Sequence, residues 1–263
     1  MERGGRMFFA TGDTHGEWTR FSSENFPEGK TLSRDDYVFI MGDFGIWDDS
    51  AREKHDFDWL AQKPFTICFV SGNHENYDML ERLPIEEWNG GKVNFIRDNI
   101  IHLRRGQVFT INGVKIFTFG GARSHDIQQG ILDPDDPQFD KKKKILNKLG
   151  GMYRINHISW WEQEMPGEKE LAEGIRNLNK HSWQVDYIFT HCAATDIQKQ
   201  LTGESTAYQS DCLTDYLEMI RCRAEYRWWV FGHYHMNCSM NDRDVVLYEQ
   251  IVTIPDKWGK DME

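Results

Sequence analysis

The chain has 263 residues, of which 39% are hydrophobic and 28% charged, and its formal net charge is −11. This length and composition predict a soluble globular protein with a substantial core. The acidic balance argues against binding of long nucleic acid or anionic lipid, because a negative surface repels both. A small anionic substrate is compatible with it, since the charge at a site can oppose the sign of the whole chain.

The sequence carries five cysteines without a CxxC pair, and it opens without a basic and apolar leader. No apolar run approaches the roughly 20 residues that span a bilayer. We therefore expect free thiols, a cytoplasmic location and no membrane association. Nothing in the sequence indicates the oligomeric state.

Short apolar runs predict strands along the whole chain, at residues 7–11, 37–41, 65–70, 107–111, 114–119, 187–190, 228–231 and 245–248. The dipeptide Asn112-Gly113 separates two of them and predicts a two-residue hairpin. Apolar residues at helical spacing predict helices at residues 50–61, 168–180 and 210–221. Strands that alternate with helices, together with a hairpin, predict a layered α/β domain with mixed sheets.

Residues 131–153 interrupt this alternation with the sequence LDPDDPQFD and a run of four lysines at 141–144. We interpret the segment as a solvent-exposed insertion in a single domain that spans residues 1–263. A basic patch that captures an anionic substrate is the alternative interpretation.

A polar cluster follows five of the predicted strands, at the point where each strand ends. The clusters are GDTHG at 12–16, GDFG at 42–45, SGNHE at 71–75, His191, and GHYH at 232–235. Because ligands of open α/β sheets bind at the carboxyl ends of strands, we expect these side chains to converge on one edge. Asp, Asn and His are ligands of divalent metals, so the ordered set predicts a metal site, although any one cluster alone is typical of a turn.

The spacing within two clusters supports a shared ion. Asp13-x-His15 and His233-x-His235 would each direct two side chains to the same side of an extended segment. The neighbouring glycines would let the chain turn sharply and bring a ligand close to the ion.

The ordered set DxH, GD, GNHE, His and GHxH, at residues 13–235, resembles the calcineurin-like metallophosphoesterase superfamily. The resemblance implies a four-layer αββα sandwich of two mixed β-sheets flanked by helices, with two divalent ions at the strand ends. The first ion would be bound by Asp13, His15, Asp43 and His235. The second would be bound by Asp43, Asn73, His191 and His233, with Asp43 bridging both.

The resemblance also implies a reaction, in which a hydroxide that bridges the two ions attacks a phosphate ester. Asp43 would hold that bridge, Asn73 and His74 would contact the substrate, and His74 would act as general acid or as a donor to the phosphate. A ligand set of Asp, Asn and His accepts Mn, Fe, Zn, Ni or Co, so the metal is not specified.

Two further segments are candidates for substrate contacts. GGARSHD at 120–126 follows a predicted strand and resembles a stretch of some small bacterial members, as does ISWWEQE at 158–164. Arg123 and His125 are candidate substrate contacts, with a surface loop as the alternative. Trp160 and Trp161 are interpreted as packing residues.

We therefore expect a metal-dependent phosphoric ester hydrolase, foremost a phosphatase acting on a small phosphate ester or a phosphopeptide. The sequence GDFGIWDD lacks the arginine of the GDxVDRG motif, which argues against a close relation to phosphoprotein phosphatases. A phosphodiesterase or nuclease acting on cyclic or short nucleotides is the first alternative. A non-catalytic scaffold is the second, and it is disfavoured because every motif position, including His74, is filled.

Overall fold

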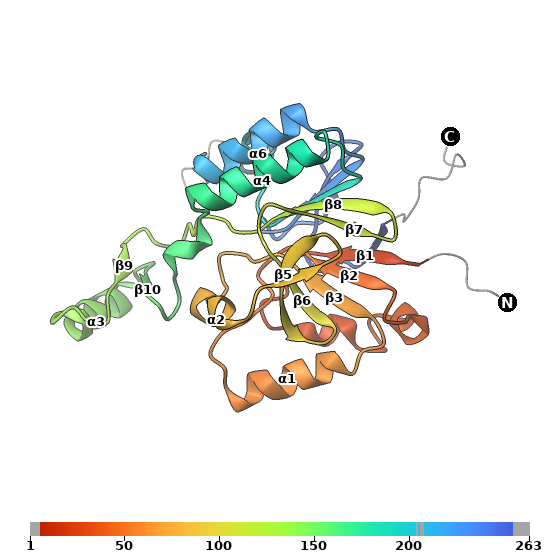
Figure 1. Cartoon of the computed structure of the whole chain (residues 1–263). Helices are drawn as coiled ribbons and strands as arrows, with labels where there is room; N and C mark the ends of the chain where they lie inside the picture. The colour runs from red at the N-terminus through yellow and green to blue at the C-terminus, as the bar shows by residue number, and fades with distance from the viewer. Residues whose placement is uncertain (1–5, 204, 206–207, 255–263) are drawn as a thin grey trace.

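Two β-sheets lie face to face between two groups of helices (Figure 1). The computed structural model describes residues 6–203, 205 and 208–254 of the chain. The predicted αββα arrangement of two mixed sheets is confirmed.

The first sheet contains seven strands within the described residues, in the order β15-β1-β2-β3-β6-β5-β4. The strands are β15 (Val252–Ile254), β1 (Phe8–Thr11), β2 (Tyr37–Ile40), β3 (Thr66–Phe69), β6 (Ile100–Leu103), β5 (Gly91–Arg97) and β4 (Glu86–Trp88). Parallel pairing joins β1, β2, β3 and β6, whereas β15, β5 and β4 each join by antiparallel pairing.

The second sheet contains six strands in the same described ranges, in the order β13-β14-β12-β11-β8-β7. The strands are β13 (Cys238–Ser239), β14 (Asp244–Val246), β12 (Trp228–Phe231), β11 (Tyr187–Thr190), β8 (Val114–Phe119) and β7 (Gln107–Ile111). The predicted hairpin joins β7 to β8, and both turn residues, Asn112 and Gly113, have the positive φ that such a turn requires.

Helices cover the outer face of each sheet. Those of the first sheet are α1 (Ala51–Ala61) and α2 (Tyr77–Arg82), and those of the second are α4 (Glu168–Lys180), α5 (Thr195–Thr202) and α6 (Cys212–Arg223). In the part of the chain that the structure describes, three short 3₁₀ helices complete the body: η1 (Trp18–Phe21), η2 (Pro27–Thr31) and η3 (Glu162–Glu164).

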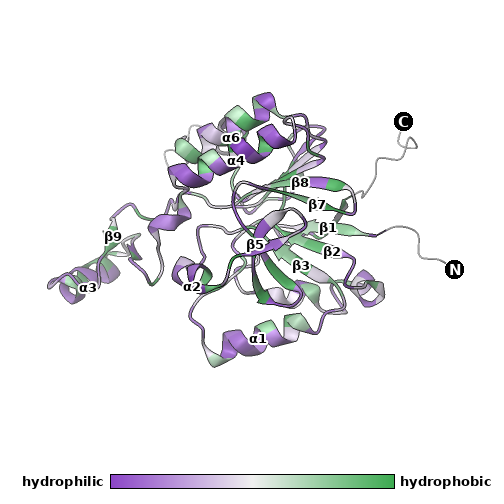
Figure 2. Ribbon diagram, in the orientation of Figure 1, coloured by the Kyte–Doolittle hydropathy of each residue, from purple (hydrophilic) through white to green (hydrophobic). Residues whose placement is uncertain are grey.

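The central strands are apolar on both faces because each face meets a different core. Phe39 of β2 packs between the sheets against Phe189 of β11, with ring centroids 4.9 Å apart. Its neighbour Val38 points the other way, into the core that Phe57 of α1 completes. Hydrophobic residues accordingly run along the strands of the first sheet in Figure 2.

An arm projects from the body between β8 and α4 (Figure 1). It consists of β9 (Ile131–Leu132), α3 (Phe139–Leu149) and β10 (Arg154–Ile155), and β9 pairs with β10 in parallel. No residue of α3 is buried. We continue to interpret this arm as an insertion in a single domain. Among the described residues, no helix has the length and apolar character needed to cross a membrane.

Candidate metal centre

The predicted metal ligands leave the two sheets at one shared edge. Asp13, Asp43 and Asn73 follow the parallel strands β1, β2 and β3, whereas His191 and His233 follow the parallel strands β11 and β12. Hydrogen bonds join the two sets: the backbone N–H of His233 donates to Asp13 Oδ1 at 2.9 Å, and His191 Nδ1 donates to the Met41 carbonyl at 2.7 Å. The structure therefore brings together residues that lie far apart in the sequence.

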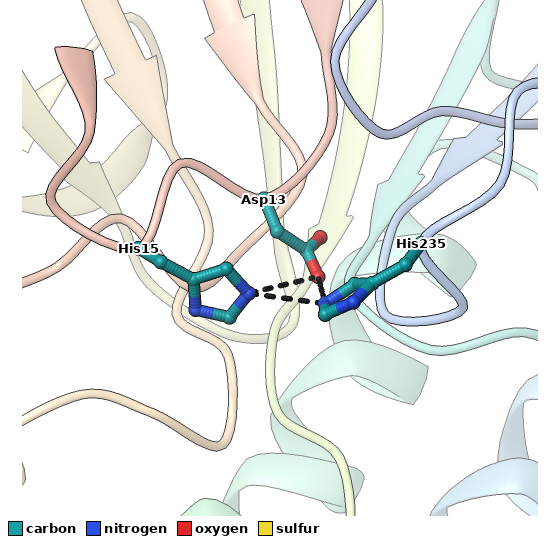
Figure 3. Close-up of side chains that lie close together, drawn as sticks. All are labelled: Asp13, His15 and His235. Atoms are coloured by element: carbon teal, nitrogen blue, oxygen red, sulfur yellow. Dashed lines mark hydrogen bonds and ion pairs between the residues drawn. The ribbon is translucent and has the colours of Figure 1, made fainter.

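Asp13, His15 and His235 form the first cluster (Figure 3). The Nε2 atoms of His235 and His15 lie 3.2 and 3.8 Å from Asp13 Oδ2, and 3.0 Å from each other. Asp13 is fully buried, and its Oδ2 atom makes no hydrogen bond of acceptable geometry with the residues that the structure describes, although His235 Nε2 lies near it. A buried carboxylate oxygen without a donor is costly unless a cation binds it.

Asp13, Asp43 and His191 form the second cluster, and Asn73 lies beside it. His191 Nε2 is 3.5 Å from Asp43 Oδ2 and 3.1 Å from Asn73 Oδ1. Because His191 Nδ1 donates to Met41, a ring that has lost its Nε2 proton would present the lone pair of Nε2 to these two oxygen acceptors. Three acceptors that face one another fit a bound cation.

The electrostatics of the second cluster also favour a bound cation. Burial lowers the pKa of His191, but the carboxylates of Asp43 and Asp13 outweigh it and raise that pKa to about 9. Burial also raises the pKa of Asp43, which His191 and His74 nevertheless hold well below its usual range. Without a metal, a proton on His191 supplies the positive charge that these carboxylates require, and a divalent ion would supply more of it.

Asp43 lies between the two clusters. Its Oδ2 atom is 3.8 Å from Nδ1 of His15 in the first cluster and 3.5 Å from Nε2 of His191 in the second. The two clusters also share Asp13, a role that the sequence did not indicate. The position of Asp43 suits a carboxylate that bridges two ions, whereas His233 approaches this site with its ring 5.0 Å from the ring of His191.

The local backbone differs from the expected one. The D-x-H and H-x-H segments were predicted to be extended, but His15, His233 and His235 have φ of 47°, 69° and 50°, and Asp43 has φ of 45°. That part of the prediction is wrong. Such left-handed conformations are rare outside glycine, and they cluster at functional sites where the surrounding structure holds them.

Close packing explains two glycines of the motifs. A Cβ atom on Gly72 would lie 2.0 Å from Asp43 Oδ1, and one on Gly232 would lie 2.2 Å from Asp13 Oδ1. Each glycine therefore makes room for a carboxylate that belongs to another loop, rather than for its own neighbour in sequence.

His74 lies beside these clusters, with its ring 5.5 Å from that of His15. Its backbone N–H donates to Asp43 Oδ1 at 2.7 Å. Burial lowers the pKa of His74, and Asp43 opposes this effect only in part. The ring is therefore neutral near pH 7, with one N–H to donate.

A cavity of about 440 Å³ borders the site, and the candidate substrate residues Arg123 and His125 line it together with Tyr208 and His233. The ring of His125 lies 5.7 Å from that of His233, whereas Arg123 is exposed to solvent. Trp161 is buried and donates from Nε1 to Asp78, which is a packing position.

Four supporting residues were not predicted in these roles. Glu75 is fully buried and accepts hydrogen bonds from the backbone N–H groups of Phe44 and Gly45, so it holds the loop that carries Asp43. Asn73 Nδ2 donates to Ser124 Oγ, which in turn donates to Glu164. Ser124 and Glu164 belong to the GGARSHD and ISWWEQE segments, so those motifs were the available indication.

Arg154, on β10 of the arm, is the fourth of these residues. It donates from Nη2 to His74 Nε2 at 3.3 Å and forms an ion pair with Asp126. No pattern in the sequence linked it to the site.

The sequence resembles those of known proteins. Residues 7–237 match the family model described as calcineurin-like phosphoesterase. A lariat debranching enzyme of Danio rerio is 23% identical over 252 residues, which cover 86% of this chain and 39% of the relative. The chain thus spans about two fifths of that curated relative.

Two solved structures align over 92% of this chain, each at 14% identity. The phosphopantetheinyl hydrolase of Mycobacterium tuberculosis has a TM-score of 0.43 with 88% of its chain covered. A putative 5′-nucleotidase of Staphylococcus aureus has a TM-score of 0.44 with 48% covered.

The family match spans nearly all of the chain, and its members are metal-dependent hydrolases of phosphoric esters, the enzyme class that the sequence predicted. The protein belongs to the calcineurin-like phosphoesterase family.

Proposed function

We propose that the protein is a phosphomonoesterase that uses two divalent metal ions to hydrolyse a small phosphate ester or a phosphopeptide. The observation that supports this most directly is the convergence of acceptors at the strand ends. Asp13 Oδ2 is buried and receives no hydrogen bond of acceptable geometry from the described residues, and Asp43 Oδ2 and Asn73 Oδ1 both face His191 Nε2.

Each ion would have four candidate ligands. The first ion would be held by Asp13, His15, Asp43 and His235, and the second by Asp43, Asn73, His191 and His233. The mixed nitrogen and oxygen set suits Mn, Fe, Zn, Ni or Co. When bound, the ions would leave about two positive charges that the carboxylates do not cancel, and would supply Lewis-acid stabilisation and a water of lowered pKa.

The protein's own side chains orient the reactants. The bond from Asn73 Nδ2 to Ser124 leaves Asn73 Oδ1 directed at the centre. His74 is placed by its backbone bond to Asp43, and its ring N–H would donate to the phosphate or to the departing oxygen. Arg123 and His125 would contact the leaving group in the adjoining cavity.

The size of that cavity supports a small substrate. At about 440 Å³ it lies in the range of small-molecule sites, so it offers room for the leaving group of a small ester.

Turnover of two synthetic esters by the manganese-loaded protein tests the proposal. We expect kcat/KM for p-nitrophenyl phosphate to exceed that for bis(p-nitrophenyl) phosphate by at least about tenfold, or about 1.4 kcal/mol. The reverse preference would favour the phosphodiesterase alternative. A protein that holds two ions per chain and hydrolyses neither ester contradicts the enzyme assignment.

A further inference from the structure

Arg154 connects the arm to the candidate active site. It begins β10, and its guanidinium group reaches back over the body to His74, 80 positions earlier in the chain. The body alone supplies the metal-ligand candidates, so Arg154 is a contribution of the arm to the site.

Asp126 fixes the orientation of this guanidinium group. Arg154 donates from Nε to Asp126 Oδ1 at 2.9 Å and from Nη2 to Asp126 Oδ2. Two parallel bonds to one carboxylate define the plane of an arginine side chain, so little conformational entropy remains to be lost when it binds a further group. The Arg154 and Asp126 side chains are 19% and 33% exposed, which shields the pair partly from solvent.

The pair leaves donors of Arg154 available. Nη2 also contacts His74 Nε2 at 3.3 Å, a long bond to an uncharged acceptor. Within the described part of the chain, Nη1 has no hydrogen-bond partner. A phosphate oxygen is a stronger acceptor than an imidazole nitrogen, because it carries negative charge.

We infer that Arg154 is a substrate-binding residue of the arm, which donates to a non-bridging oxygen of the substrate phosphate beside His74, and that Asp126 is its positioning residue. This inference rests on the proposed function, and it names the group that recognises the phosphate. A simple tether between the arm and the body would need the Arg154–Asp126 pair but not the contact with His74.

Phosphate binding and ester preference separate these two roles. Isothermal titration of inorganic phosphate into the manganese-loaded protein is compared for wild type, Arg154→Ala, Arg154→Lys and Asp126→Asn. Lys142→Ala is the matched control, because it removes a basic side chain and its ion pair with Asp136 from the same arm. Manganese content per chain is measured for every variant.

We expect Arg154→Ala to weaken phosphate binding about 10- to 100-fold, the loss typical of a hydrogen bond between charged groups, at unchanged manganese content. Asp126→Asn and Arg154→Lys should show smaller losses, and Lys142→Ala none. The loss in kcat/KM should be larger for p-nitrophenyl phosphate than for its bis ester, because the monoester presents more unesterified oxygens.

Phosphate binding by Arg154→Ala that equals wild type overturns the inference and leaves the proposed function standing. Equal losses on both esters, accompanied by loss of manganese, also overturn it and show a tether. Wild type that binds phosphate but hydrolyses neither ester contradicts the proposed function alone, since the comparison of phosphate binding is made without turnover.

Discussion

Asp43 Oδ1 accepts a hydrogen bond of 2.7 Å from the backbone N–H of His74. This bond ties the loop after β2 to the loop after β3, so the candidate bridging carboxylate and the candidate acid position each other. Glu75, the next residue, adds bonds to the backbone of Phe44 and Gly45. The two loops therefore behave as one unit, and a change that displaces the backbone of either should affect both the metals and the chemistry.

Replacement of His74 by asparagine should separate metal binding from turnover. The backbone bond to Asp43 remains in His74→Asn, so we expect two ions per chain as in wild type. The ring donor is lost, so kcat should fall by about 10²- to 10⁴-fold. Elemental analysis and p-nitrophenyl phosphate turnover measure the two quantities.

His55→Asn is the control for this substitution, because His55 is exposed on α1, away from the site. It should leave both quantities unchanged. Wild-type turnover by His74→Asn would show that His74 has no part in the reaction.

A methyl group on Gly72 should displace the bridging carboxylate. Its position 2.0 Å from Asp43 Oδ1 requires the two loops to move apart, which should cost about 1 to 3 kcal/mol of unfolding free energy. Gly72→Ala should also bind less manganese. Urea unfolding and elemental analysis provide the measurements.

Gly167→Ala is the control for this substitution, since a Cβ atom at Gly167 would meet no atom of the described residues within 4 Å and the φ of Gly167 is −81°. We expect the free energy of unfolding to change by less than about 1 kcal/mol, because Gly167 is the N-cap residue of α4 and an alanine there costs little. Equal effects of the two substitutions would refute the account of close packing at Gly72.

Glu164 should make stability depend on pH. Burial raises its pKa from 4.5 to about 7, although the hydrogen bonds from Ser124 lower it in part. Because the folded pKa lies above the unfolded one, the stabilising contribution is complete below pH 4.5 and is lost as the pH rises through about 7. Between pH 5 and pH 8, the metal-free wild type should lose about 1 to 3 kcal/mol more than Glu164→Gln.

Urea unfolding in the presence of EDTA measures this difference, and Glu162→Gln, at an exposed neighbouring position, serves as the control. Parallel pH profiles for wild type and Glu164→Gln would contradict the assigned role of the buried carboxyl.

The strands that carry the site could be predicted because each is a continuous apolar run with both faces buried. The predicted ranges at 187–190 and 228–231 coincide with β11 and β12. Strands β4 and β5 were missed, since β4 begins with two exposed glutamates and β5 has charged residues near both ends. The buried strand β6 was missed as well, although it is mostly apolar. Helix α6 begins at Cys212 rather than at residue 210, because the Asp211 side chain caps it by accepting from two backbone N–H groups.

The residues of the candidate site that directly follow strands could also be predicted from the sequence. Its strand-end residues stand in short local motifs, and parallel pairing brings such positions together. Arg154 stands 28 residues from Asp126 and 80 from His74, and no local pattern records contacts at that separation. The shared role of Asp13 likewise depends on how the two sheets meet, which strand periodicity does not specify.

The metal content of wild type and of Asp43→Asn tests the central claim most directly. The account predicts two manganese ions per chain in wild type, seen by elemental analysis and by anomalous scattering between Asp13 and His191. It predicts at least about a tenfold weaker affinity in Asp43→Asn, because that variant keeps the shape of the side chain but loses its charge. Wild type that binds no ion there, or Asp43→Asn that binds two ions as tightly as wild type, would contradict it.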